Sequence, residues 1–498
     1  MQTVSDALRW WAHITPDALA LSIDGDAISY RALHDWSGKI AARLLAMGLV
    51  PGDRVSIAAA NSANYCALIA GIIRAGGTVA PLNMRYTKTE VAELLEDQAP
   101  RFAFADEARL GLFDGLEPEL FDLDVVCGWR DDGPADPRVV HDPDQAVVII
   151  ATSGSTAKPK GVMLTHRSMT SYAAAWAVEE PHCAKGARII VPAPLSTSAG
   201  FVQLIHYTVL GCSLYFVSAF DPDAFLDLIV TRRITGFGGV PLFFERIAQT
   251  SGFAGADLSS VTMATTGGAA VPRALQDVWA ERGVVLRQIY GQTEAGGNAT
   301  IMPEALAGEF PEKCGRGGVF TELAIAGEDG THLPAGELGE IVLRGPGIMK
   351  GYWNNPEETA RALKQGWLHT GDLGTLDERG LLQFVDRKKD IIISGGLNIS
   401  AAEVERAVAG FEGVAEVMVI AAKDAKFGET PMAVIHATTD IDVAALIAHC
   451  NDRLADFKVP RYVAIEAEPL PRTATGKLAK PVMRDKYRNA AECLPKVR

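Results

Sequence analysis

The chain has 498 residues and a mass of 53.1 kDa, which is larger than one hydrophobic core usually serves, so several structural units are expected. Hydrophobic residues make up 48% and charged residues 22% of the chain, as is typical of a soluble globular protein. A formal net charge of −14 argues against general binding of nucleic acid or anionic membranes, so the expected partners are small molecules.

Cysteine usage and hydropathy exclude further classes. The seven cysteines are scattered without a Cys-x-x-Cys pair, which argues against a zinc site and a disulfide framework. The first residues lack the basic and apolar regions of a signal peptide. No apolar run is long enough to cross a membrane, so we expect no integral membrane segment and a cytoplasmic protein, either a monomer or a homodimer.

The first hundred residues alternate helical and strand patterns. The expected elements are helices at 3–13 and 31–48, a strand at 54–59, a helix at 61–76, a strand and turn at 79–85, and a helix at 87–97. This alternation is typical of a parallel sheet covered by helices. From 100 to 145 the pattern weakens, and the run 131–144, rich in Pro and Asp, predicts an exposed connection.

Two strands, 146–151 and 161–165, enclose a polar loop. The loop contains four hydroxyl residues, a glycine and two lysines, namely Thr152, Ser153, Ser155, Thr156, Gly154, Lys158 and Lys160. Convergent backbone N–H groups, hydroxyls and ammonium groups suit a phosphate. The alternative is a flexible polar hairpin, since loops of this composition are common. It is not a Walker A loop, because no Gly-Lys-[Ser/Thr] triplet closes it.

A second series of helices and strands follows the loop. The expected elements are helices at 168–178, 200–210 and 221–232, strands at 189–192 and 213–217, and a short strand and turn at 236–241. Short strands punctuated by glycine, at 322–326, 339–344 and 382–385, predict a small β-rich subdomain. The last hundred residues contain helices at 401–409 and 442–454 and strands at 414–420 and 432–437. They can bury a core of their own, so we place a domain boundary near Lys389, between residues 1–388 and 389–498.

The loop sequence SGSTAKPKGV resembles the phosphate loop of the adenylate-forming superfamily, which includes acyl-CoA synthetases, amino-acid adenylation domains and luciferases. Further segments match this superfamily in the same order from about residue 10 to 480. The resemblance implies an α/β fold. A large N-terminal domain would contain two α/β layered subdomains and a small β-rich subdomain, and a small mobile α+β C-terminal domain would follow.

The resemblance also implies where ATP and Mg²⁺ bind. The segment Gly267, Gly268 and Ala269, which alone would be read as a tight turn, would lie along the adenine. The motif YGQTE at 290–294 would stack Tyr290 on the adenine, with Gly291 beside it. Thr293 would contact the α-phosphate and Glu294 would hold Mg²⁺. A carboxylate suits this hard cation, which spreads the charge of the triphosphate.

Further matches follow in the C-terminal part of the chain. Asp372, in the motif WLHTGD, and Arg387 would reach the ribose, although such a pair is more often a solvated ion pair. Lys389 occupies the hinge position between two domain orientations. Gly395 and Gly396 would line the channel for the pantetheine arm of CoA, where glycine lets a thin chain approach the backbone.

Lys477, in the motif PRTATGK, matches the catalytic lysine of the superfamily; alone it would be read as a solvated surface lysine. With Thr293 and Glu294 it would serve adenylate formation, in which a carboxylate attacks the α-phosphorus of ATP and expels pyrophosphate. A thiol then attacks the acyl adenylate. The implied activity is an ATP-dependent carboxylic acid:CoA ligase. The alternatives are an enzyme that loads a carrier protein, a non-catalytic nucleotide-binding regulator and, least favoured, a P-loop phosphotransferase.

The acid is harder to predict. Many relatives carry an aromatic residue followed by histidine where this chain has Ser196 and Thr197, so no relative's substrate carries over directly. The matching wall positions are Trp176, Thr197, Ser198, Phe201, Phe243 and Gly291, of which Trp176 and Phe243 are more typical of a core. These segments contain no arginine to pair with a second carboxylate, which disfavours dicarboxylic acids. We expect a medium-chain fatty or aryl acid.

Overall fold

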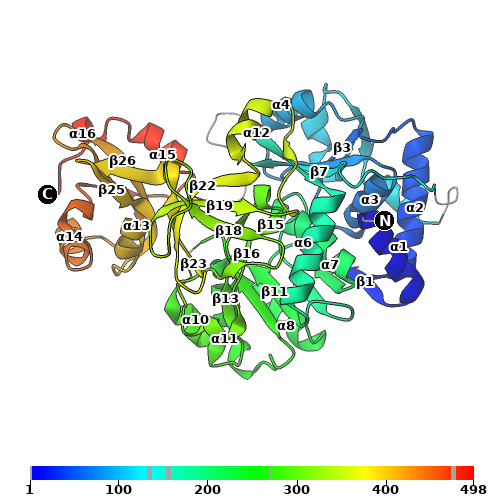
Figure 1. Ribbon diagram of the computed structural model, residues 1–498, viewed down its shortest axis with the longest axis horizontal. Coiled ribbons are helices and arrows are strands. Elements are labelled where there is room, and N and C mark those ends of the chain that lie inside the picture. Colours follow the sequence, from blue (N-terminus) through cyan, green and yellow to red (C-terminus); the bar gives the residue numbers. More distant parts are fainter. Residues whose placement is uncertain (1–2, 132–136, 153–158, 270, 473–477) are drawn as a thin grey trace. The chain divides into compact units, whose positions relative to one another are not determined.

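The computed structural model describes residues 3–131, 137–152, 159–269, 271–472 and 478–498. The chain divides into two compact units. The larger unit comprises Met1–Ala324, Val342–Thr370 and Leu376–Gln383, and the smaller comprises Ile325–Ile341, Gly371–Thr375 and Phe384–Arg498. Figure 1 labels their helices and strands in chain order.

The first sheet of the larger unit has seven strands in the order β20-β8-β7-β4-β3-β5-β6. The strands are β3 (Arg54–Ala58), β4 (Thr78–Pro81), β5 (Phe102–Ala105), β6 (Glu119–Asp122), β7 (Ala146–Thr152), β8 (Lys160–Thr165) and β20 (Gly351–Tyr352). Strands β3 to β7 run parallel, whereas β8 pairs antiparallel with both β7 and β20. The predicted hairpin around the polar loop is therefore present, and a segment from almost 200 residues later extends it.

The second sheet also has seven strands, in the order β13-β12-β11-β9-β10-β1-β2. The strands are β1 (Leu19–Ile23), β2 (Asp26–Ser29), β9 (Arg188–Val191), β10 (Ser213–Phe216), β11 (Gly236–Gly239), β12 (Met263–Thr266) and β13 (Leu286–Gln288). All run parallel except β2. The N-terminal strand β1 pairs with β10 in the register Leu21↔Leu214, so the start of the chain completes a sheet built mostly from its middle.

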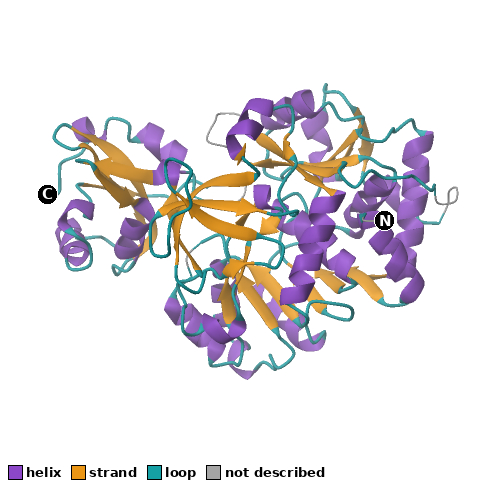
Figure 2. Ribbon diagram, viewed as in Figure 1, coloured by secondary structure: helices purple, strands orange, loops and turns teal. Residues whose placement is uncertain are grey.

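Helices cover these sheets, as the purple ribbons in Figure 2 show. The α-helices are α1 (Val4–Ile14), α2 (Tyr30–Ala46), α3 (Ala63–Arg74), α4 (Lys88–Gln98), α5 (Val125–Gly128), α6 (His166–Glu179), α7 (Ser198–Leu210), α8 (Pro222–Thr231), α9 (Pro241–Ala248), α10 (Arg273–Ala280), α11 (Glu304–Ala307) and α12 (Pro356–Ala362). Short 3₁₀ helices are η1 (Glu107–Phe113), η2 (Phe253–Gly255) and η3 (Thr293–Ala295). Side-chain oxygens of Thr3, Ser29, Ser62 and Thr87 accept hydrogen bonds from the first turns of α1 to α4, which satisfies otherwise unpaired backbone donors.

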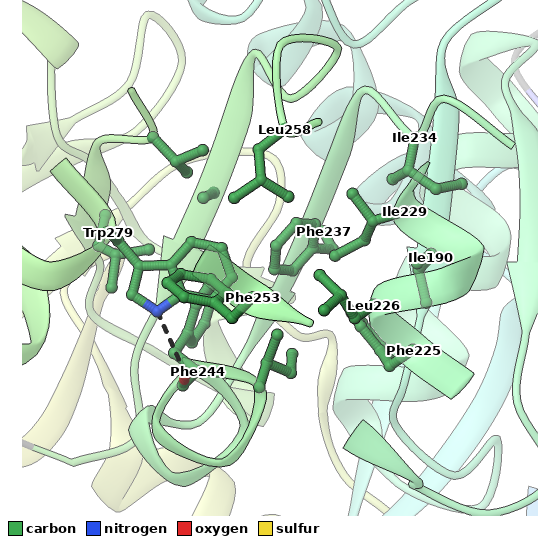
Figure 3. Close-up of a cluster of buried hydrophobic side chains, with 14 of the residues drawn as sticks. Ile190, Phe225, Leu226, Ile229, Ile234, Phe237, Phe244, Phe253, Leu258 and Trp279 are labelled. Carbon is green, nitrogen blue, oxygen red and sulfur yellow. Dashed lines mark hydrogen bonds between the residues drawn. The ribbon is translucent and has the colours of Figure 1, made fainter. Parts of the chain in front are cut away.

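An aromatic core fills the space between the second sheet and helices α8, α9 and α10 (Figure 3). Phe237 of β11 stacks on Phe244 of α9, with ring centroids 5.4 Å apart, and both meet Trp279 of α10. The indole of Trp279 donates to the carbonyl of Phe244 at 3.2 Å, so its polar edge is satisfied inside the core. Burial of each such side chain contributes about 1.5–3 kcal/mol.

Short strands make up a β-rich region. They are β14 (Gly291–Gln292), β15 (Gly297–Asn298), β16 (Thr300–Ile301), β17 (Arg316–Gly317), β18 (Glu322–Ala326), β19 (Gly339–Arg344), β21 (Leu363–Lys364), β22 (Trp367–Leu376) and β23 (Leu382–Arg387). The predicted strands 322–326 and 339–344 coincide with β18 and β19. Strands β18, β19 and β22 contribute residues to both compact units.

The smaller unit contains a five-stranded sheet of its own. Its strands are β24 (Ile391–Ser394), β25 (Leu397–Ser400), β26 (Val414–Asp424), β27 (Gly428–Ala437) and β28 (Tyr462–Glu466), and its helices are η4 (Lys388–Asp390), α13 (Ala401–Ala409), α14 (Val443–Asn451), η5 (Asp456–Lys458), α15 (Lys480–Lys486) and α16 (Ala490–Cys493). Alternate residues of β26 face opposite sides, so Val419 packs with α13 and α14 while Met418 packs with α15 and α16.

The predicted fold class is confirmed, since the two layered α/β sheets, the β-rich region and the C-terminal α+β unit are all present. The sequence analysis was wrong about residues 100–131, where β5, η1, β6 and α5 replace the expected loss of pattern, and it missed β1 and β2. Strands β1, β2, β5 and β6 have only four or five residues each, which is too few for a hydrophobic period to identify them in the sequence. The boundary proposed at Lys389 stays a prediction. Within the described ranges, no helix combines the length and apolar character needed to span a membrane.

Candidate active site

Four parallel strands of the second sheet, β9, β11, β12 and β13, end at the same edge. Residue Gly239 pairs with Thr266, and Thr266 pairs with Gln288, so the segments that follow these residues lie side by side. The amide of Ile289 donates to the carbonyl of Thr266 at 2.9 Å. Ligands of open α/β sheets bind at the carboxyl ends of the strands, which makes this edge the candidate site.

The predicted adenine segment is a turn at this edge. Gly267 is half-buried, and a Cβ atom on it would lie 2.9 Å from the carbonyl oxygen of Ile289, so only glycine fits against the neighbouring strand end. Gly268 has a φ of +81°, and Gly268 and Ala269 are exposed. A flat ring could therefore approach the backbone here.

The YGQTE motif begins where β13 ends. Tyr290 is buried, and its backbone amide donates to Thr300 at 2.8 Å. Gly291 pairs with Asn298 in the β14–β15 hairpin, and Thr293 and Glu294 follow in η3, both half-buried. The hairpin thus holds the motif at the carboxyl edge of the sheet.

Substituting Gly291 by alanine is expected to reduce adenylate formation about a hundredfold, because small displacements of catalytic groups have costs of this size. A Cβ atom at Gly291 would lie 2.2 Å from the carbonyl oxygen of Gly297, so the hairpin backbone would have to move. Acid-dependent exchange between ATP and pyrophosphate measures the effect. Gly308→Ala is the control, since a Cβ atom there has no neighbour within 4 Å. Equal rates for the two variants would contradict the expectation.

The phosphate hairpin is described up to its two ends. Thr152 pairs with Lys160, and the Thr152 hydroxyl donates to the Lys160 carbonyl at 3.3 Å. The predicted phosphate-binding residues Ser153, Gly154, Ser155 and Thr156 lie outside the described residues. The ammonium group of Lys160 makes an ion pair with Glu358 of α12. It also lies 5.1 Å from the ring centroid of Tyr352.

Tyr352 connects this hairpin with the YGQTE motif. Its hydroxyl donates to Oε1 of Glu294 at 3.0 Å. The structure therefore brings together Lys160 and Glu294, two predicted site residues that are more than a hundred positions apart. The sequence analysis did not single out Tyr352 or Glu358, because their partners are 58 and 198 residues away and no local pattern marks them.

Glu294 suits the predicted role of a magnesium ligand. In the ranges that the structure describes, no group of three or more His, Cys, Asp or Glu side chains could hold a metal ion. Mg²⁺ usually takes one or two protein carboxylates and completes its shell with water and substrate phosphate oxygens. A half-buried carboxylate at the carboxyl edge of the sheet fits that requirement.

The predicted acid-binding residues are only partly accessible. Thr197 caps α7 by accepting from the amide of Gly200 at 3.3 Å, and Ser198 is half-buried. Phe201 and Trp176 are buried in the core, whereas half-buried Phe243 stacks on Phe220 with ring centroids 4.4 Å apart. Of these three rings, only that of Phe243 is partly exposed.

A buried histidine of α7 packs against Trp176. The rings of His206 and Trp176 are 5.5 Å apart, and that of Tyr172 is 4.8 Å from His206. Burial lowers the pKa of His206 to about 3, and its Nε2 atom has no hydrogen-bond partner. At a pH between about 3 and 6.5, His206 is therefore protonated in the unfolded chain but neutral in the folded chain.

Because the folded-state pKa of His206 is depressed, the wild type is expected to lose stability as the pH falls below about 6.5, and this loss saturates near the folded-state value. At about pH 5 the loss from this residue is ~2 kcal/mol. His206→Phe should remove it while keeping an aromatic ring. Denaturant unfolding at neutral and acid pH measures the difference, with the exposed His182→Gln as control. Identical pH dependence in wild type and His206→Phe would contradict the expectation.

In the smaller unit, Asp372 and Arg387 lie close together, with Arg387 Nε 3.7 Å from Asp372 Oδ1. Asp372 is buried and Arg387 is exposed. The neighbouring carboxylate of Asp386 turns inward and accepts from the hydroxyl of Ser400 at 2.8 Å and from the amide of Ala402 at 2.9 Å. Asp386 therefore caps α13 and leaves Arg387 to face outward.

The remaining predicted residues of the smaller unit lie in a short helix and a turn. Lys389 is in η4, and partial burial together with the charge of Arg387 holds the pKa of this lysine below its usual value. Gly395 and Gly396 join β24 to β25 with φ values of +57° and +85°, as a two-residue hairpin turn requires. Lys477 lies outside the described residues.

Two layered α/β sheets, a candidate site at the carboxyl edge of the second sheet and a separate C-terminal unit are the architecture of an adenylate-forming enzyme. The chain belongs to the AMP-binding enzyme family: residues 8–353 match the AMP-binding enzyme model, and residues 403–477 match the model of the AMP-binding enzyme C-terminal domain.

Characterised relatives span nearly the whole chain. Feruloyl-CoA synthase from an Amycolatopsis species is 37% identical and covers 96% of this chain and 97% of its own length. Long-chain-fatty-acid–CoA ligase FadD13 of Mycobacterium tuberculosis is 33% identical, with 98% and 99% covered. The structure of o-succinylbenzoate CoA synthetase (MenE) from Bacillus subtilis with its acyl-adenylate intermediate has a TM-score of 0.89 at 27% identity, with 96% and 98% covered.

These matches confirm the predicted activity. The chain is an acid–thiol ligase of the acyl-CoA synthetase type. Solved neighbours include MatB from Rhodopseudomonas palustris bound to ATP and MenE from Bacillus subtilis in complex with ATP and magnesium ion. The assignment of individual residues to these ligands stays a prediction.

Proposed function

We propose that this ligase activates a medium-chain fatty or aryl acid as its acyl adenylate and transfers the acyl group to CoA, releasing AMP and pyrophosphate. The contact chain from Lys160 through Tyr352 to Glu294 carries the proposal. It joins a cation in the phosphate hairpin to a carboxylate suited to Mg²⁺, which is the pairing that a triphosphate requires.

In the first step, a carboxylate oxygen of the acid bonds to the α-phosphorus of ATP, and the bond to the pyrophosphate oxygen breaks. The hairpin residues Thr152 to Thr156, together with Lys160, donate to the phosphates. Thr293 contacts the α-phosphate, Glu294 holds Mg²⁺, and Tyr290 with the segment 267–269 encloses the adenine. Bound Mg²⁺ supplies charge neutralisation for the triphosphate.

In this proposal an N-terminal domain, 1–388, binds ATP and the acid, and a mobile C-terminal domain, 389–498, carries the catalytic lysine. Asp372 and Arg387 hold the ribose hydroxyls. Lys477 neutralises charge on the reacting carboxylate and the α-phosphorus. In the second step the thiol of CoA attacks the acyl carbonyl and AMP leaves. The pantetheine arm of CoA passes Gly395 and Gly396. Lys389 is the hinge between the domain orientation for adenylate formation and that for thioester formation.

The acid is proposed to be apolar beyond its carboxylate. Half-buried Phe243 offers aromatic surface to the region, whereas Trp176 and Phe201 are buried, and Thr197, Ser198 and Gly291 are small. Relatives named for long-chain fatty, feruloyl and indoleacetate substrates support both fatty and aryl acids. With ATP and CoA as co-substrates, we propose a cytoplasmic monomer or homodimer with no nucleic-acid partner.

Pyrophosphate release with CoA tests the proposal across medium-chain fatty, long-chain fatty, aryl and dicarboxylic acids. We expect the highest kcat/KM for a medium-chain fatty or aryl acid, with AMP as the nucleotide product. A dicarboxylic acid as the best substrate, or ADP as the product, would refute it.

A second candidate is loading of a carrier protein. The relative Fatty acid–[acyl-carrier-protein] ligase ScoC, at 30% identity over 98% of this chain, favours it. Comparing free CoA with a phosphopantetheinylated carrier protein as acceptor separates the two. Transfer to the carrier protein alone would replace CoA in the proposed reaction.

A further inference from the structure

Tyr352 lies between two proposed binding groups and contacts both. Its hydroxyl donates to Glu294 Oε1 at 3.0 Å, and the ammonium group of Lys160 lies 5.1 Å from its ring centroid. The same ammonium group pairs with Glu358, and the side chains of Lys160 and Glu358 are 12% and 17% exposed. One ring therefore separates the proposed phosphate cation from the proposed metal carboxylate.

The backbone fixes the ring in this place. Tyr352 belongs to β20, which pairs with β8 in the register Tyr352↔Val162. The amide of Trp353 donates to the carbonyl of Gly161 at 2.7 Å, and the amide of Met349 donates to the carbonyl of Glu294 at 2.9 Å. The segment is thus hydrogen-bonded to the hairpin on one side and to the YGQTE motif on the other.

The groups around Tyr352 are complementary in charge, with the carboxylates of Glu294 and Glu358 on one hand and the ammonium group of Lys160 on the other. The carboxyl group of Glu358 stays charged, because its hydrogen bond with Lys160 lowers its pKa. The face of the phenol ring is attractive to the ammonium group of Lys160.

We propose that Tyr352 is a positioning residue of the nucleotide–metal site. Its hydroxyl orients the carboxylate of Glu294 toward Mg²⁺, and its ring, with Glu358 as counter-ion, holds the ammonium group of Lys160 near the phosphates. This inference rests on the proposed roles of Glu294 and Lys160. Removing a group that orients a metal ligand by hydrogen bonding lowers metal affinity or activity about ten- to a hundredfold.

Tyr352→Phe tests the proposal, because it removes the hydroxyl and keeps the ring. The Kd of ATP is measured by displacement of a fluorescent ATP analogue across a range of Mg²⁺ concentrations. We expect the Mg²⁺ concentration for half-maximal tightening to rise about tenfold or more. We also expect adenylate formation to slow, and thioester formation from supplied acyl adenylate to stay at the wild-type rate.

Tyr65→Phe is the matched control, since Tyr65 is buried and its hydroxyl has no hydrogen-bond partner. Its Mg²⁺ dependence should equal that of the wild type. The unfolding midpoint shows whether Tyr352→Phe remains folded. A folded variant with wild-type Mg²⁺ dependence would overturn the positioning role. A wild-type enzyme without acid-dependent pyrophosphate release would instead overturn the proposed function, so the two failures are distinguishable.

Discussion

Substituting Lys477 by alanine is expected to abolish acyl-adenylate formation while leaving thioester formation from supplied acyl adenylate largely intact. The first step gathers negative charge at the carboxylate and the α-phosphorus, which a localised ammonium group can neutralise. The second step starts from an anhydride that is already formed. Loss of one such electrostatic partner costs roughly 10²–10³ in rate. Exchange of pyrophosphate into ATP measures the first step, and AMP release from supplied adenylate and CoA measures the second.

The control for this experiment is Lys423→Ala, which removes an exposed lysine of β26 elsewhere in the smaller unit. It should leave both steps unchanged. If Lys477→Ala slowed both steps equally, the division of labour between adenylate and thioester formation would be refuted. The expected outcome would also show that the lysine acts on the first step and is not required for CoA to reach the intermediate.

Breaking the buried ion pair between Arg287 and Glu180 is expected to have the largest effect on stability. Both side chains are less than 10% exposed, and Arg287 Nη2 donates to Glu180 Oε2 at 2.9 Å. Arg287 belongs to β13, which leads directly into the motif that begins at Tyr290. Arg287→Met would leave Glu180 charged and buried without its partner. Such a loss costs about 3–5 kcal/mol, measurable as a lower free energy of unfolding in urea.

Two comparisons isolate the cause. The double variant Glu180→Leu/Arg287→Met removes both charges and should recover most of the lost stability. Arg273→Met breaks an exposed pair with Asp277 and should cost less than about 1 kcal/mol. If Arg287→Met proved as mild as Arg273→Met, the expected cost of leaving Glu180 buried without its partner would be refuted.

Much of the site was predictable because its residues are neighbours in sequence. The strands on either side of the polar loop, and the hairpin ends Thr152 and Lys160 that they bring together, follow from local composition. The family resemblance added roles to these residues, and the comparisons confirm the reaction class that it implied. The roles of individual residues stay predictions.

Other features depended on contacts between distant segments. Strand β1 pairs with β10 and strand β20 with β8, in each case almost 200 residues away, and neither β1 nor β20 is long enough to show a period of its own. The burial of Trp176 and Phe201 follows from the packing of α6 on α7.

The amino-acid sequence was therefore sufficient for the fold class, the motifs and the reaction, because its elements follow from short-range patterns and its motifs resemble, in order, those of the adenylate-forming superfamily. Tertiary structure alone placed Tyr352 between Lys160 and Glu294 and gave Lys160 its counter-ion, Glu358, 198 residues away. The reason is physical. Hydrogen bonds and ion pairs between side chains depend on distances of a few ångströms, which only the folding of several sheets and helices together sets.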